Sequence, residues 1–361
     1  MPGARFASLG LFGEVGSLMS AAKKKRRDGD TYLTYSKTIT EEAGDALWYL
    51  ANAALRLKLE FGDVAARAGL ISPSQSPKTA TFKSLMVPTD HGNNAIDLER
   101  QLLQLGGTVG SLVIAIAADN ELAPEAMTSL FADVLYNLAT ISHFADVRLN
   151  DAIAVNMAKI ASRWPESKRY GDSYDDDYDI DERLPLILSM RFRVRVLSGK
   201  TYIVQSWNGV NIGDRITDNR QTEDYYRYHD IFHLAFAAVL GWSPVLRSLL
   251  RLKRKSRPDV DENQDGARAL VIEEAIVAWI FNHASAEHNI KSNYKVDYDL
   301  LKSIQILVSG YEVESRALWQ WEEAISQAFR IFDQIIVTRQ GTVTINLVDH
   351  AITFENEASI A

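Results

Sequence analysis

The N-terminal half of this chain contains an internal repeat of helical segments, and this repeat constrains the fold more than any other feature. Residues 11–18 align with residues 105–112, and residues 44–50 align with residues 132–138 in the same order. Each copy carries apolar residues at helical spacing and corresponds to one helical hairpin. One hairpin cannot bury its apolar face alone, whereas two hairpins can pack into a four-helix core. Chance similarity between amphipathic helices is the alternative, and the shared order disfavours it.

The repeat therefore predicts a tandem helical domain over residues 1–168. Its copies lie at about 8–69 and 96–165, and together they form a four-helix-type bundle. Helices of the second copy are expected over about 96–117, 123–146 and 149–163. Residues 70–93 are rich in Ser, Pro, Thr and Gly, which is typical of a connecting segment.

A different pattern follows the repeat. Residues 169–183 contain seven acids, and we interpret them as a solvated interdomain linker. Residues 191–205 alternate apolar and polar side chains around a Ser-Gly pair, which predicts a β-hairpin, and residues 342–354 form a second strand-like stretch. Helical patterns lie between them, over residues 222–253, 266–288, 297–307 and 311–332. The chain is thus predicted to be mainly α, with residues 184–361 forming a mostly helical domain that has a small β-sheet and resembles no family we recognise.

The composition excludes several kinds of chemistry. The 361 residues include no cysteine, so disulfides, thiolate catalysis and iron–sulfur clusters are excluded, and a metal must bind to carboxylates, histidines or backbone oxygens. The net charge of −8 disfavours nucleic acid as a partner. We find no apolar run of about 18 residues and no signal-peptide pattern, so we expect a cytoplasmic protein that does not bind membranes.

Four carboxylates in the first copy are candidates for a metal site. Glu42 and Asp45 lie three residues apart and share one helix face, and Glu41 lies four residues before Asp45. Glu14 is surrounded by apolar residues. Converging carboxylates in apolar surroundings repel one another unless a cation binds, and oxygen ligands suit Mg²⁺ or Mn²⁺. The alternative is a helix N-terminus with ordinary acids, capped by Thr40.

Two motifs in the first copy carry a resemblance to a known family. Residues 13–18 (Gly-Glu-Val-Gly-Ser-Leu), a basic helix end, and residues 41–50 (Glu-Glu-Ala-Gly-Asp-Ala-Leu-Trp-Tyr-Leu) resemble MazG-like nucleotide pyrophosphohydrolases. The resemblance covers about residues 8–165. It implies an all-α fold that cleaves nucleoside triphosphates to monophosphate and pyrophosphate, with Mg²⁺ bound by a Glu-x-x-Glu pair and a Glu-x-x-Asp pair.

The resemblance assigns catalytic and metal-binding roles to individual residues. Glu14 matches the first acid of the first pair, and Glu42 and Asp45 match the second pair. The second acid of the first pair falls on Ser17, which departs from the family pattern and leaves the number of metal ions open. Glu41 is the nearby carboxylate that could replace it.

The second copy supplies residues that the resemblance links to nucleotide binding. Asn156 and Lys159 match the Asn-x-x-Lys tail of single-copy members, and the first copy lacks this tail. The two copies therefore complement each other and predict one composite site. Lys24 and Lys25, in the basic helix end, are further candidates for binding the leaving pyrophosphate. The alternative for this basic end is a solvated surface.

A second candidate site lies in the C-terminal region. His229 and His233 are four residues apart on a predicted helix, and Asp230 lies between them. Glu273 and Glu274 lie within another apolar helix. These five residues predict either a metal or acid–base site, or a buried network that orders the core. The basic run 251–257 could contact phosphates, but we favour a basic surface loop.

The leading hypothesis is a Mg²⁺-dependent nucleotide pyrophosphohydrolase whose substrate is a nucleoside triphosphate. One alternative is a nucleotide-sensing protein that binds without turnover, as the Ser17 departure would allow. Another is a metal hydrolase centred on His229 and His233. The sequence leaves open whether chains associate into a homo-oligomer.

Overall fold

The computed structural model describes the chain except for residues 1, 87–97, 119–122, 222, 287–294 and 358–361. The chain divides into two compact units, residues 1–161 and 162–361, each of which is described by itself. The prediction of a mainly α protein with one small sheet is confirmed.

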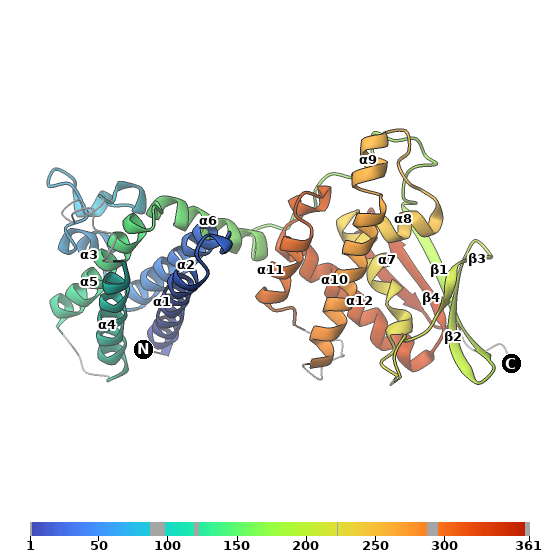
Figure 1. The fold of residues 1–361 in the computed structure, drawn as a ribbon, viewed down its shortest axis with the longest axis horizontal. Coiled ribbons are helices and arrows are strands. Elements are labelled where there is room, and N and C mark those ends of the chain that lie inside the picture. The colour runs from blue at the N-terminus through green and yellow to red at the C-terminus, as the bar shows by residue number, and fades with distance from the viewer. Residues whose placement is uncertain (1, 87–97, 119–122, 222, 287–294, 358–361) are drawn as a thin grey trace. The chain divides into compact units, whose positions relative to one another are not determined.

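The first unit is a helical bundle (Figure 1). Helix α1 packs against α2 and α4, and α5 packs against α2, α3 and α4. The core contains buried leucines, valines and a phenylalanine at helical spacing, which is why these amphipathic segments pack together. The helices are α1 (Pro2–Asp28), α2 (Tyr35–Arg56), α3 (Phe61–Arg67), α4 (Leu98–Ala117), α5 (Pro124–Phe144) and α6 (Leu149–Arg163).

The connection between the two copies is described only in part. Short 3-10 turns occur at Pro77–Thr79 and Phe82–Ser84. Residues 87–93 of the predicted connecting segment lie outside the described residues, as do residues 96 and 97 at the start of the second copy.

Helix α4 is long and apolar enough to cross a membrane by length and composition alone, and the bent pair Tyr226–Leu240 and Pro244–Leu250 passes the same test. Buried core helices of globular domains also meet this criterion of length and hydropathy. Leu105, Val109 and Leu112 of α4 are buried in the bundle. We therefore interpret α4 as a core helix.

The second unit is built on a sheet that joins its two ends. Within the described residues the strand order is β3-β2-β1-β4-β5, and all neighbours are antiparallel. The predicted hairpin turn is present, with Ser198 and Gly199 both at positive φ (51° and 77°), the combination that type I′ turns require. The strands are β1 (Ile187–Leu197), β2 (Lys200–Trp207), β3 (Val210–Ile216), β4 (Gly341–Asn346) and β5 (Ala351–Glu355).

Helices cover one face of this sheet (Figure 1). Alternate residues of β1 and β4 are buried, and α7 and α12 pack against β4 and β5. The helices are α7 (Asp230–Leu240), α8 (Pro244–Leu250), α9 (Pro258–Asn263), α10 (Ala267–Ala286), α11 (Tyr298–Leu307) and α12 (Leu318–Thr338).

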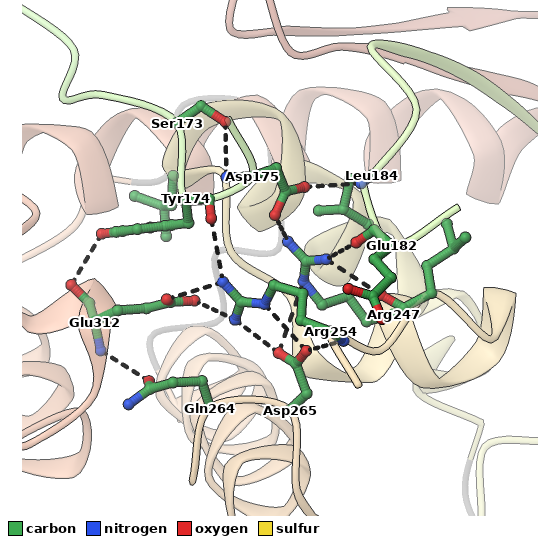
Figure 2. A network of polar contacts seen from close by, with 12 residues as sticks. Ser173, Tyr174, Asp175, Glu182, Leu184, Arg247, Arg254, Gln264, Asp265 and Glu312 are labelled. Carbon is green, nitrogen blue, oxygen red and sulfur yellow. Dashed lines mark hydrogen bonds and ion pairs between the residues drawn. The ribbon is translucent and has the colours of Figure 1, made fainter. Parts of the chain in front are cut away.

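The acidic segment is part of the second unit and anchors in it through buried residues, so the interpretation of residues 169–183 as a solvated interdomain linker is wrong (Figure 2). Asp175 is buried, accepts a hydrogen bond from the Leu184 amide (2.8 Å) and forms an ion pair with the buried Arg247. The Tyr174 hydroxyl donates to the Glu312 carbonyl (2.9 Å). Because Asp175 neutralises a buried guanidinium, it is part of the core.

The basic run 251–257 is a loop in which Arg251, Lys255 and Arg257 are exposed, as predicted, and Arg254 is the exception. Arg254 is fully buried and forms ion pairs with Asp265 and Glu312, at 2.7 Å each (Figure 2). Two carboxylates compensate this guanidinium, as a buried charge requires. Arg254 therefore stabilises the unit and is not exposed to a phosphate ligand.

Candidate active site

A close contact between helices α2 and α6 positions the residues of the first candidate site. A Cβ on Gly44 would lie 2.2 Å from the Ala152 carbonyl oxygen and 3.2 Å from the Asn156 Cβ. Only glycine allows the α6 backbone to approach α2 so closely. The residue that follows, Asp45, is consequently held beside α6.

Asp45 binds the two polar residues predicted from the second copy. The Asn156 side-chain amide donates to Asp45 Oδ1 (2.6 Å), and Lys159 Nζ forms an ion pair with the same carboxylate. The Asp45 and Lys159 side chains are only 15% and 19% exposed. The structure thus brings together residues that lie 111 and 114 positions apart in the chain.

Glu14 of α1 completes the cluster. Its side chain hydrogen-bonds Glu42, and it lies within electrostatic range of Asp45 and Glu41. Burial raises the Glu14 pKa above its ordinary value, and Asp45 and Glu41 raise it further, whereas the Glu42 hydrogen bond and Lys159 oppose the shift. A hydrogen bond between two carboxyl groups needs a proton on one of them. A divalent cation could replace that proton.

The alternative of an ordinary helix N-terminus is wrong for these acids. Helix α2 begins at Tyr35, so Glu41, Glu42 and Asp45 lie beyond its first turn, where the helix dipole no longer stabilises acids. Thr40 does not cap the helix, since its hydroxyl donates to the Ser36 carbonyl (2.8 Å) within α2.

Two predicted basic residues lie away from the cluster. Lys25 pairs with Asp30 (3.1 Å), and Lys24 is exposed near Asp28. Both are at the end of α1, at least ten residues beyond Glu14, which corresponds to about 15 Å along the helix. Their binding to pyrophosphate stays a prediction.

The five residues of the second candidate site meet in the second unit. His233 Nδ1 lies 2.8 Å from Glu273 Oε1, and both side chains are almost completely buried. The Ser243 hydroxyl donates to Glu273 Oε1 (2.7 Å), and the Val245 amide donates to Oε2 (2.8 Å). Both oxygens of Glu273 are therefore hydrogen-bonded.

The remaining residues surround the other edge of His233. His229 Nε2 lies 3.0 Å from Asp230 Oδ1 and 3.7 Å from Glu274 Oε2. Burial alone would lower the pKa of His233, but Glu273 and Glu274 outweigh it and hold the pKa well above its ordinary value. Burial would raise the pKa of Glu274, but the neighbouring histidines His233 and His229 lower it.

Sequence reasoning missed Ser243, Tyr226 and Gln205, which support this cluster. The predicted helix over 222–253 is broken at Gly241 (φ 68°), and Ser243 then caps α8. The Ser-Pro pair at the start of α8 was a usable signal, because serine is favoured at the N-cap and proline directly after it.

Comparison with known proteins identifies the second unit. Residues 169–358, just over half of the chain, match the family model described as MazG C-terminal domain. No curated protein and no solved structure matches the chain. The prediction that the C-terminal region belongs to no recognisable family is therefore wrong. The MazG-like resemblance of the N-terminal half is untested by these comparisons and stays a prediction.

Proposed function

The chain belongs to the MazG-related family that this C-terminal domain defines, and from this premise we propose that its first unit hydrolyses nucleoside triphosphates. The products would be a nucleoside monophosphate and pyrophosphate, and the reaction would depend on Mg²⁺, with Mn²⁺ as a substitute. At the family level, a MazG-related domain fits a function like that of the nucleotide pyrophosphohydrolases.

One observation carries the proposal, namely the convergence of Glu14, Glu42 and Asp45 from two helices in a partly buried cluster. Their mutual repulsion is unfavourable without a positive charge, and the Glu14 pKa is raised mainly by burial, with a smaller contribution from the Asp45 charge. Three carboxylates offer the hard oxygen ligands that Mg²⁺ prefers. The donor set therefore fits the ion.

The residues of the second copy suit the substrate. Bound Mg²⁺ would neutralise phosphate charge and lower the pKa of a bound water molecule. Glu14 or Glu42 gives up the shared proton when the carboxylates act as ligands. Lys159 forms an ion pair with Asp45 in this structure. Once a metal ion binds Asp45, the Lys159 ammonium group can pair with the phosphate oxygens instead, and the Asn156 amide can donate a hydrogen bond to them.

Pyrophosphate release tests the proposal. The full chain is incubated with a panel of ribo- and deoxyribonucleoside triphosphates, with and without Mg²⁺. Asp45→Asn should abolish release while the fold is retained, and without metal its melting temperature should change little, because the lost repulsion from Glu14 is offset by the lost ion pair with Lys159. Asp133→Asn is the matched control, since Asp133 is the exposed aspartate at the equivalent position of the second copy. Full turnover by Asp45→Asn would contradict the proposed site.

Binding without turnover is a second candidate, favoured by two observations. Ser17 stands where a fourth carboxylate is expected, and Lys159 already neutralises Asp45. This candidate predicts that nucleotides bind in a way that depends on Asn156 and Lys159, while no nucleotide of the panel yields pyrophosphate. Measuring affinity and release on the same samples separates the two functions.

A further inference from the structure

We infer that the second unit contains a transition-metal site formed by His229, His233 and Glu274, with Asp230 beside it. The inference does not depend on the proposed hydrolysis, because its residues all belong to the second unit. It rests on the orientation of the two imidazole rings, on the distances between the ligand atoms, and on the residues that hold them.

Both rings present Nε2 to the same point. His229 Nδ1 lies 2.9 Å from the Tyr226 carbonyl oxygen, and His233 Nδ1 lies 2.8 Å from Glu273 Oε1. Carbonyl and carboxylate oxygens only accept hydrogen bonds, so both Nδ1 atoms carry the hydrogen. A bound metal ion would take the place of the proton that the neighbouring carboxylates favour on His233 Nε2, and each ring would then offer its Nε2 lone pair to the metal.

His233 Nε2 is buried and has no hydrogen-bond partner among the described residues. Its nearest carboxylate oxygens, on Glu274 and Asp230, lie at 3.6 and 3.9 Å, too far for a hydrogen bond. Unpaired buried polar atoms are uncommon, and this one faces a second histidine and two carboxylates. The unpaired atom indicates a missing ligand between the side chains.

The distances fit a metal ion at that point. The ligand atoms of His229, His233 and Glu274 all lie within 4.8 Å of one another. The Glu274 carboxylate lies 3.7 Å from His229 Nε2 through Oε2 and 3.6 Å from His233 Nε2 through Oε1. A tetrahedral ion with bonds of about 2.1 Å separates its ligands by about 3.4 Å. Small side-chain movements would therefore complete the coordination.

An outer layer of contacts holds each ligand in place. Glu273 orients His233 and is itself fixed by Ser243 and the Val245 amide. The Tyr226 ring stacks on His229, with ring centroids 4.4 Å apart. Gln205 donates to the outer oxygen of Asp230. Such carboxylate–histidine contacts are typical of metal sites, where they set the tautomer and the ring orientation.

The ligand chemistry selects the kind of metal. Two imidazole nitrogens and a carboxylate favour Zn²⁺ or a similar first-row transition ion over Mg²⁺ and Ca²⁺, which prefer oxygen. The Glu274 side chain is 44% exposed, so one side of the site is open to solvent. Two histidines and one carboxylate with an open fourth position form the arrangement of ions that also bind water or a substrate.

Metal content and thermal stability test the inference. The full chain is stripped with chelator, dialysed against micromolar Zn²⁺ or Mg²⁺, and analysed for metal. An Asp45→Asn background lowers metal binding by the first unit. We expect one Zn²⁺ per chain, no equivalent Mg²⁺, a higher melting temperature with Zn²⁺, and a Co²⁺ spectrum typical of tetrahedral nitrogen and oxygen ligands.

Two variants distinguish a metal site from a buried network. Glu274→Gln should lower Zn²⁺ affinity at least tenfold, and because Glu274 is partly exposed we expect this variant to fold. His283→Gln is the matched control, because His283 lies on the same helix, α10, beside one carboxylate, Asp297 (2.8 Å). It should retain the metal. No bound Zn²⁺ in the parent protein, or equal Zn²⁺ in both variants, would overturn the inference.

Discussion

The two polar clusters of this protein, one in each unit, compensate their buried charges in different ways. In the first unit, carboxylates converge and are compensated by Lys159 and a shared proton. In the second unit, Glu273 and His233 compensate each other, and a layer of hydrogen bonds holds them. The contacts of the first cluster can be exchanged for a bound cation or phosphate, as the proposed function requires. The contacts of the second cluster are fixed in advance, so a substitution that removes one of them should lower the free energy of unfolding more than a substitution in the first cluster does.

The largest expected effect is on the stability of the second unit. Glu273→Ala removes the partner of a buried histidine and leaves Ser243 and the Val245 amide without their acceptor. We expect a loss of about 3–5 kcal/mol in the free energy of unfolding, measured by urea denaturation without metal. Glu274→Ala, one residue along α10 and partly exposed, should cost less than about 1 kcal/mol. Equal losses for the two variants would show that Glu273 is held no more firmly than its exposed neighbour and would contradict a second cluster whose contacts are fixed in advance.

An intermediate effect concerns the first unit. Lys159→Ala should weaken nucleotide binding by about tenfold, or about 1.4 kcal/mol, through one lost charge-assisted contact. Mg²⁺ alone should bind at least as tightly as before, because the competing cation at Asp45 is gone. Isothermal titration with each ligand separately measures both. Parallel losses of Mg²⁺ and nucleotide affinity would indicate that Lys159 only supports the fold.

The smallest expected effect is on how stability depends on pH, where Glu14 and Glu274 should act in opposite directions. The Glu14 pKa is raised above 4.5 in the folded state, so its contribution to stability is present below that pH and is lost as the pH rises through the folded pKa. The Glu274 pKa is lowered, so its contribution is present above 4.5 and is lost as the pH falls through the folded pKa.

Melting temperatures across the acidic range measure this difference. In Glu14→Gln the melting temperature should fall less as the pH rises above 4.5. In Glu274→Gln it should fall less as the pH drops below 4.5. Saturating Mg²⁺ should suppress the first effect in the parent protein. A shift in the same direction for both variants would contradict the contrast between the clusters.

Local patterns predicted much of the secondary structure. Helix α6 has the bounds expected from its sequence, and the Ser198-Gly199 turn joins two strands as its composition indicates. The break between α7 and α8 was missed, because the apolar pattern continues through Gly241. This glycine has a left-handed backbone conformation, which ends α7. Of the first site, the family resemblance predicted that Asn156 and Lys159 meet the acids of the first copy, but not that both contact Asp45.

The sequence by itself determined the mainly α character, the two-hairpin repeat and the residues able to bind metals, since periodicity and turn chemistry depend on neighbours within a few positions. Only the tertiary structure decided which charges are buried. Asp175 is buried because Arg247, 72 positions away, meets it, and Asp45 is compensated by residues more than 100 positions away. A charge enters the interior only where a partner compensates its lost hydration, and that partner is chosen by the packing of distant segments.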